Sequence, residues 1–196
     1  MHFTPMRMFS STKYKGTENY INTQRTYEIL RTIIYFAISF SLFIAGYVTT
    51  QTRMNLLTVV AVVGCLPGCK SLIGVIMFLR YKSCSKNICD RIKTIDSRHT
   101  TVFDMIFTSY DINFNVGHMV IAGNTVCGFT EDDKFNETAF QKHIQNILKM
   151  DGHKNVSVKI YKDLDKYIDR ISQLNELEAD PQETQAVTIT LKSVTL

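Results

Sequence analysis

The sequence predicts a helical hairpin of two transmembrane helices, followed by a small cytoplasmic α/β domain of the α+β kind. Two observations predict the hairpin: residues 32–52 carry no charge over 21 positions, and residues 55–79 carry one charge, Lys70, over 25 positions. A helix of about 20 apolar residues is long enough to cross a bilayer. The third observation is that strand-like alternation and helix-like periodicity follow one another through residues 99–175.

The overall composition excludes two other classes of protein. The 196 residues include only nine glycines and three prolines, which excludes collagen-like and proline-rich disordered chains. The net charge of +4 is too small to indicate nucleic-acid binding by itself. Charge is unevenly distributed, because residues 80–98 carry six basic and two acidic side chains, whereas residues 99–196 carry nine basic and 14 acidic ones.

The first apolar run is interpreted as a signal anchor, because the 31 residues before it are too many and too polar for a cleaved signal peptide. Residues 1–17 contain no acidic side chain and several Ser, Thr, Lys and Arg residues, which leaves a mitochondrial transit peptide as an alternative. Positive flanks remain on the inner side of a membrane. Because residues 1–31 and 80–98 are both basic, we expect a multi-pass protein of the cell membrane with both termini in the cytoplasm.

Small residues recur every four positions on both predicted spans and indicate close helix packing. They are Ala37, Ser41 and Ala45 on the first span and Gly64 and Gly68 on the second. Such faces let two helix backbones approach each other. The sequence leaves open whether they pack within one hairpin or between subunits.

The centre of the second span, Gly-Cys-Leu-Pro-Gly-Cys-Lys-Ser at 64–71, is similar to a phosphate-binding loop. Cys69 replaces the second glycine of that motif, and the following residues are apolar on all sides, which favours a membrane helix. Pro67, next to Gly68, predicts a kink. Lys70 either extends to the headgroups or is a functional intramembrane charge.

Residues 80–98 predict a basic helix from Tyr81 to Ser97, in which Cys84, Ile88, Ile92 and Ile95 recur at helical spacing. Its cations would contact anionic lipid headgroups or the phosphates of RNA. These cations are Arg80, Lys82, Lys86, Arg91 and Lys93.

The remaining elements follow from periodicity and turn residues. We expect a strand at 101–110, a hairpin around Gly123 and Asn124, a helix capped by Asp133 or Asn136, a strand at 155–161 and a helix capped by Asp163. The predicted parts are an N-terminal segment at 1–31, the hairpin at 32–79, the α/β domain at 80–175, and an acidic linker with an extra strand or disordered tail at 176–196.

The order helix, three strands, helix and strand between Tyr81 and Tyr161 is similar to the core of restriction-endonuclease-like nucleases and nuclease-related membrane domains. That resemblance implies two acids holding Mg²⁺ and a lysine that helps to activate water. No acid-x-Lys pair occurs on the predicted hairpin 118–127, so the active site of that family looks absent. Asp104, Asp111 and Glu131 are the acids that a divergent nuclease would have to bring together.

The segment NLLTVVAVVGCLPGCKSLIGVIMFLR, with GNTVCGFT after it, resembles small two-span membrane proteins of clostridial bacteria. This resemblance implies no activity. In size and basic flanks the chain is also similar to small Firmicute membrane proteins that hold a noncoding RNA at the membrane.

The five cysteines are an odd number on an expected cytoplasmic face, which predicts free thiols. Two alternatives would give some of these cysteines a chemical role. Cys84, Cys89 and His99 would supply three of four zinc ligands. Cys127 with His118 would form a nucleophile and base. We expect no cofactor, no metal and no catalytic residue.

The sequence therefore favours a non-enzymatic, membrane-anchored scaffold or interaction protein that presents an α/β domain and forms oligomers. The expected partners are the lipid bilayer and a second copy or another protein, and no small-molecule substrate is identified. An RNA-binding protein that uses the basic helix and a divergent metal-dependent nuclease remain the alternatives.

Overall fold

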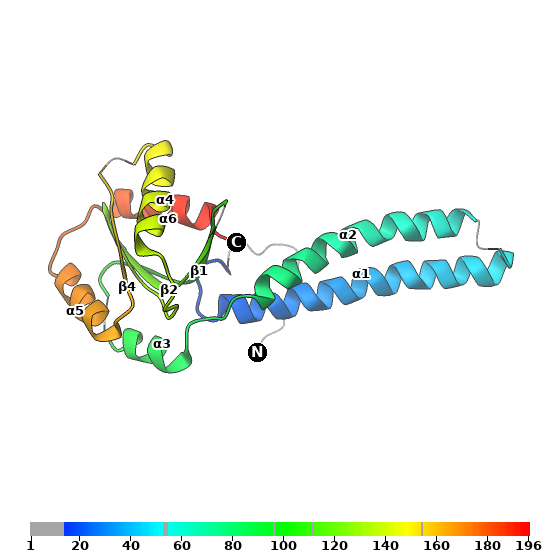
Figure 1. The fold of residues 1–196 in the computed structure, drawn as a ribbon, viewed down its shortest axis with the longest axis horizontal. Helices are drawn as coiled ribbons and strands as arrows, with labels where there is room; N and C mark the ends of the chain where they lie inside the picture. Colours follow the sequence, from blue (N-terminus) through cyan, green and yellow to red (C-terminus); the bar gives the residue numbers. More distant parts are fainter. Residues whose placement is uncertain (1–13, 53–54, 96, 111, 154) are drawn as a thin grey trace. The chain divides into compact units, whose positions relative to one another are not determined.

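The computed structural model describes residues 14–52, 55–95, 97–110, 112–153 and 155–196. The chain forms two compact units (Figure 1). One contains residues 21–82, and the other combines residues 14–20 with residues 83–196.

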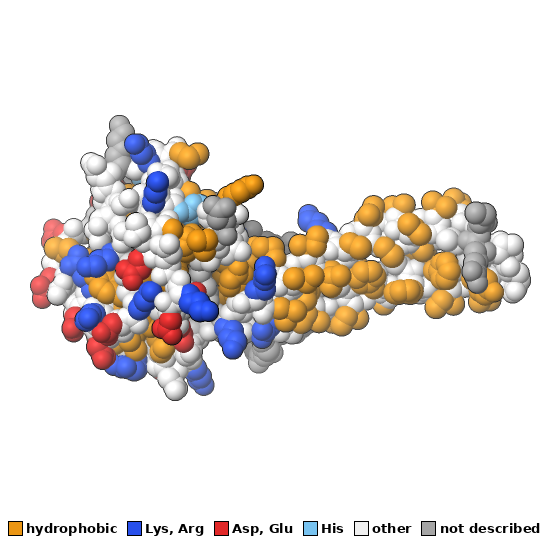
Figure 2. All heavy atoms as spheres, viewed as in Figure 1, with side chains coloured by type: hydrophobic (Ala, Val, Ile, Leu, Met, Phe, Trp, Pro, Cys, Tyr) orange, Lys and Arg blue, Asp and Glu red, His pale blue; other side chains and the backbone are white. Residues whose placement is uncertain are grey.

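The first unit consists of two helices, α1 (Tyr20–Thr50) and α2 (Leu56–Leu79). Both are long and apolar enough to cross a membrane. In the most apolar part of each helix, less than a quarter of the residues is buried. Hydrophobic side chains consequently dominate the surface of this unit (Figure 2), including those of Ile33, Ile38, Phe40, Val62 and Leu66.

Small and polar residues, by contrast, lie between the two helices. Thr32, Ser39 and Gly46 are buried at intervals of seven residues on α1. A Cβ atom at Gly64 would lie 3.0 Å from Ser39 Oγ, and one at Gly46 would lie 2.8 Å from Leu57 Cβ. The two backbones therefore approach too closely for larger side chains at these glycines.

The predicted small residues divide between two surfaces. Gly64 and Gly68 lie against α1, with Gly68 beside the ring of Phe36. Ala37, Ser41 and Ala45 are exposed and do not line the contact with α2. These three residues are therefore not part of the packing between α1 and α2. Helix α2 continues through Pro67, and both Pro67 and Lys70 are exposed.

The second unit is a four-stranded mixed sheet with helices on both faces (Figure 1). The strand order is β1-β2-β3-β4, antiparallel through β3 and parallel between β3 and β4. Helices α4 and α6 cover one face, and α3 and α5 cover the other. The elements are α3 (Lys86–Lys93), β1 (Thr100–Thr108), β2 (Asn113–Ala122), β3 (Thr125–Phe129), α4 (Glu137–Met150), β4 (Ser157–Tyr161), α5 (Leu164–Asn175) and α6 (Pro181–Ser193).

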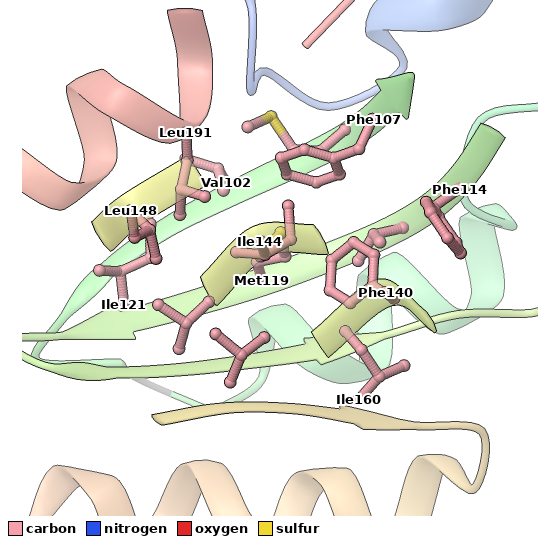
Figure 3. Close-up of a cluster of buried hydrophobic side chains, with 14 of the residues drawn as sticks. Val102, Phe107, Phe114, Met119, Ile121, Phe140, Ile144, Leu148, Ile160 and Leu191 are labelled. Atoms are coloured by element: carbon pink, nitrogen blue, oxygen red, sulfur yellow. The ribbon is translucent and has the colours of Figure 1, made fainter. Parts of the chain in front are cut away.

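The main core lies between the sheet and the α4–α6 layer (Figure 3). It contains Phe140, Ile144 and Leu148 from α4, and Val187 and Leu191 from α6. Local signals place these elements as the sequence predicts. Asn136 Oδ1 accepts a hydrogen bond from Ala139 N at 3.0 Å, and Asp163 Oδ1 accepts one from Asp165 N at 3.0 Å.

Two predicted elements need correction. The tail expected as a strand or disordered segment forms α6, which begins after the N-cap Asp180 with Pro181 in its first turn. Alternation would place Val187, Ile189 and Leu191 on one face, but the helix buries Val187 and Leu191 and exposes Ile189. The basic helix expected at 81–97 is only α3, because α2 ends at Leu79 and residues 81–85 are irregular.

The free edge of β1 is covered by segments from both ends of the described chain. We call residues 14–19 the N-terminal strap. Phe103 N donates a hydrogen bond to Gly16 O in this strap at 2.9 Å. Farther along β1, Leu196 N donates to Ile106 O at 3.0 Å. These contacts satisfy edge groups that would otherwise be open to pairing with another chain.

Because α6 is a helix, shortening two neighbouring side chains to Ala should change the free energy of unfolding by different amounts. Leu191→Ala removes a fully buried side chain and is expected to lower the free energy of unfolding by about 2–5 kcal/mol. Ile189→Ala changes an exposed side chain, so its effect should be within about 0.5 kcal/mol. Denaturant unfolding of the full chain in detergent measures both, and equal losses would contradict the helical assignment.

Candidate functional site

Side chains normally alternate between the two faces of a sheet, and this alternation is interrupted once in β1 and once in β2. The interruption shapes the site around His118. Val102 and Met105 both face the α4–α6 core, although they are three residues apart, and Val116 and Met119 on β2 do the same. The register is unchanged across the break, since Phe103 pairs with His118 and Met105 with Val116. The intervening Asp104 has a φ of 52°, a left-handed conformation that is uncommon for a residue other than glycine.

Asp104 and Glu131 hold the segment that leads into α3. Asp104 is buried, and its Oδ1 accepts a hydrogen bond from Cys84 N at 2.9 Å. Glu131 accepts a hydrogen bond from Ser85 N at 2.7 Å and another from Ser85 Oγ. Two of the three acids of the nuclease hypothesis thus bind adjacent backbone groups and have a structural role. Asp111 lies outside the described residues.

The break also turns Phe103 and His118 toward the α3–α5 face. His118 is 1% exposed, and its ring centroid lies 4.4 Å from that of Phe103. Its Nδ1 lies 2.7 Å from the hydroxyl of Tyr167, and its Nε2 has no hydrogen-bond partner among the described residues. Burial lowers the pKa of His118 to about 3, so the imidazole is neutral at physiological pH.

The Tyr167 hydroxyl determines which imidazole nitrogen carries the proton. Tyr167 is fully buried, and burial raises its pKa well above the ordinary value, so the phenol stays protonated. A buried hydroxyl needs an acceptor. His118 Nδ1 is the acceptor that the described residues provide, which places the imidazole proton on Nε2.

A cavity of about 250 Å³ lies beside this imidazole. Its walls come from β1, β2, the end of α3 and α5. They are formed by Ile92, Lys93, Ile95, Ser97, Thr101, Phe103, His118 and Ile171. Lys93, on the rim, forms an ion pair with Glu18 in the N-terminal strap, which raises the pKa of Lys93. The cavity thus combines an apolar wall with several hydrogen-bond donors.

The cysteines do not form the reactive pairs weighed from the sequence. Cys127 pairs with Val120 across the sheet rather than with His118, and burial raises the pKa of its thiol. Burial also raises the pKa of Cys84 and Cys89. These two thiols flank the first turn of α3, at positions where apolar side chains commonly pack against each other.

The zinc hypothesis has no support in the site geometry. His99 Nε2 lies 2.8 Å from Leu174 O, where it is engaged by the backbone at the end of α5. In the part of the chain that the structure describes, no three His, Cys, Asp or Glu side chains are arranged to hold a metal ion.

The five predicted phosphate-binding cations do not form one helix face. Arg80 and Lys82 belong to the unit of α1 and α2, whereas Lys86, Arg91 and Lys93 belong to the sheet unit. Arg91 forms an exposed ion pair with Asp165 at 2.6 Å. On the face shown in Figure 2, basic and acidic side chains of the sheet unit are interspersed. The RNA-binding alternative stays a prediction.

A buried polar cluster between α1 and α2 was not anticipated from the sequence. Glu28 forms an ion pair with Arg31, and Ser71 Oγ donates a hydrogen bond to Glu28 Oε2 at 3.3 Å. Thr32 Oγ1 lies 2.8 Å from Ser71 Oγ, and Gln24 Nε2 donates to Glu28 Oε1 at 3.2 Å. The available signal was that Glu28 is the only acidic residue between Glu18 and Asp90.

Comparison with known proteins adds no assignment: no protein family, curated protein or solved structure matches this chain. The cavity beside His118 and the polar cluster around Glu28 are therefore interpreted from their own geometry.

The neutral, buried His118 predicts a loss of stability in acid. Its pKa is about 3 in the folded chain and about 6.5 when unfolded, so the unfolded state binds more protons between these values. Stability therefore falls as the pH falls below about 6.5, by about 2 kcal/mol between pH 7 and pH 5. Denaturant unfolding in detergent measures this difference. It should be lost in His118→Gln and kept in His153→Gln, and the same difference in both variants would refute the assignment.

The Glu28–Arg31 pair predicts a distinctive pattern in a double-mutant cycle. Glu28→Ala removes the carboxylate that pairs with the partly buried Arg31 guanidinium and is expected to cost about 3 kcal/mol. Because the two side chains interact, Arg31→Ala should cost less in the Glu28→Ala background than in the unchanged chain. Denaturant unfolding in detergent compares the four chains of the cycle. Losses that simply add would contradict a buried pair.

Proposed function

We propose that this protein is a membrane-anchored scaffold, in which the α1–α2 hairpin crosses the bilayer and presents the α/β domain to partners in the cytoplasm. The supporting observation is the inverted distribution of polarity in the hairpin. A set of polar side chains, Glu28, Thr32, Ser39 and Ser71, is buried in this unit, whereas many large apolar side chains are exposed along both helices. Such a surface is stable in lipid and would cause aggregation in water.

The lengths and charges of the helices support this orientation. Helix α1 has 31 residues and α2 has 24, which at 1.5 Å per residue gives about 46 and 36 Å. Of the charged residues described in this unit, Arg25, Glu28 and Arg31 lie toward the start of α1, Arg80 and Lys82 follow α2, and Lys70 lies within α2. A net positive charge at that end favours a cytoplasmic location for both termini.

The scaffold would act by self-association of its hairpin. Ala37, Ser41 and Ala45 form an exposed stripe of small residues on α1 that α2 does not use. Without water to drive association, helices in lipid associate through close backbone contacts at such residues. A second copy of the hairpin would fit this stripe, and the attached α/β domains would then be clustered at the membrane surface.

Cysteine crosslinking in native membranes tests anchoring and self-association together. In a Cys65→Ala, Cys69→Ala background, Ser41→Cys is expected to give a covalent dimer on mild oxidation, because this position is exposed on the proposed interface. The matched control Ser39→Cys lies between α1 and α2 and should give no dimer. The chain should also stay in the membrane fraction after an alkaline wash.

Three results would refute the proposal. Release of the chain by the alkaline wash would exclude the anchor. Dimers formed equally by both cysteine variants, or by neither, would exclude the stripe as the interface. Recovery of a stoichiometric RNA with the purified protein would instead support the RNA-binding alternative.

A further inference from the structure

The buried imidazole beside the cavity has a hydrogen-bond donor that the described residues leave without an acceptor. The imidazole Nε2–H has no partner among the described residues, although His118 is almost completely buried. A buried donor without an acceptor costs about 1–3 kcal/mol. Such a group is therefore retained at a cost to stability that a bound acceptor would offset.

The other polar groups around the cavity are also able to donate. Lys93 contributes an ammonium group at the rim, where it is paired with Glu18, and Thr101 contributes a hydroxyl group. The Ser97 hydroxyl, also at the cavity, donates to His99 O at 3.4 Å. Among the described residues that form the walls, none is acidic, although Glu18 is paired with Lys93 at the rim. This set of donors, which includes one positive charge, selects a ligand with negatively charged oxygen atoms.

The remaining walls specify the size and shape of the ligand. Ile92, Ile95 and Ile171 provide branched aliphatic surface, and Phe103 provides an aromatic ring. At about 250 Å³, the cavity is smaller than the roughly 300–1,000 Å³ of typical drug-sized pockets. We propose that it binds a free small monocarboxylate with a short branched or aromatic tail, whose carboxylate accepts a hydrogen bond from Lys93 at the rim and, when the Phe103 ring beside the imidazole moves aside, a second one from His118 Nε2.

Two of the cavity residues also hold the N-terminal strap. Phe103, which covers the imidazole, donates its backbone N–H to Gly16 O, and Lys93 forms an ion pair with Glu18. A carboxylate ligand would therefore compete with Glu18 for Lys93. Because the strap leads directly into α1, ligand binding would weaken the attachment of the chain at the start of this helix.

The test uses the full chain in detergent and two matched pairs of ligands. Isobutyrate and benzoate are titrated beside their neutral amides, isobutyramide and benzamide, and binding is measured by ligand-observed NMR. We expect saturable binding of at least one acid, with its amide weaker by about tenfold or more because the charge-assisted hydrogen bonds are lost. The result does not depend on the membrane proposal, since no membrane contact is involved.

Three surface substitutions identify the site without disturbing the core. Lys93→Met should weaken binding of the acid by about tenfold. The control Lys86→Met, on the same helix but away from the cavity, should leave binding unchanged. Glu18→Gln removes the competing carboxylate and should strengthen binding several-fold, an effect that a purely structural role of the Lys93–Glu18 pair does not produce.

The same measurements define how the proposal fails. It is overturned if neither acid binds saturably up to about 10 mM, which corresponds to a very weak complex. It is also overturned if an amide binds as well as its acid, or if Lys93→Met and Lys86→Met have the same effect. A loss of acid binding in Glu18→Gln would also overturn it, because the Lys93–Glu18 pair would then maintain the structure of the cavity and not compete with the ligand.

Discussion

The α/β unit depends on one backbone constraint, the paired interruption of β1 and β2 at Asp104 and Gly117. Asp104 takes a left-handed conformation there, and a Cβ atom at Gly117 would lie 3.3 Å from Cys84 Cβ. Since both strands are interrupted at opposed positions, the ladder keeps its register while the side chains beyond the break change face. Strained backbone of this kind persists where the surrounding contacts determine it.

Several features of the candidate site follow from that interruption. It directs Phe103 and His118 to the α3–α5 layer, where Tyr167 binds the imidazole and the cavity opens beside it. It also places Asp104 where its carboxylate can hold the segment before α3. None of the residues of the site stands out in the sequence. They come together only because β1 and β2 are interrupted at opposed positions.

The hairpin is governed by a different rule, in which polar groups are buried and apolar groups are exposed. A carboxylate, a guanidinium and two hydroxyl groups satisfy one another around Ser71. In an apolar environment such groups are costly unless they are mutually hydrogen-bonded, so they determine which faces of α1 and α2 meet. The lysine that the sequence emphasises, Lys70, is exposed beside this cluster, and the adjacent serine makes the contact between the helices.

Much of the architecture was predictable from local sequence, because it is determined by local physics. The two apolar helices, the turn at Gly123 and Asn124, and the caps at Asn136 and Asp163 each depend on residues within a few positions of one another. The sequence alone also determined that two long apolar segments precede an acidic α/β unit. Tertiary structure decided the rest. The Val-Thr-Ile-Thr-Leu run near the end of α6 alternates like a strand, yet burial of Val187 and Leu191 against the sheet makes it a helix. His118 contacts Tyr167 and shares a cavity with Lys93 only after two strands and two helices pack together. No spacing in the sequence records contacts between residues so far apart.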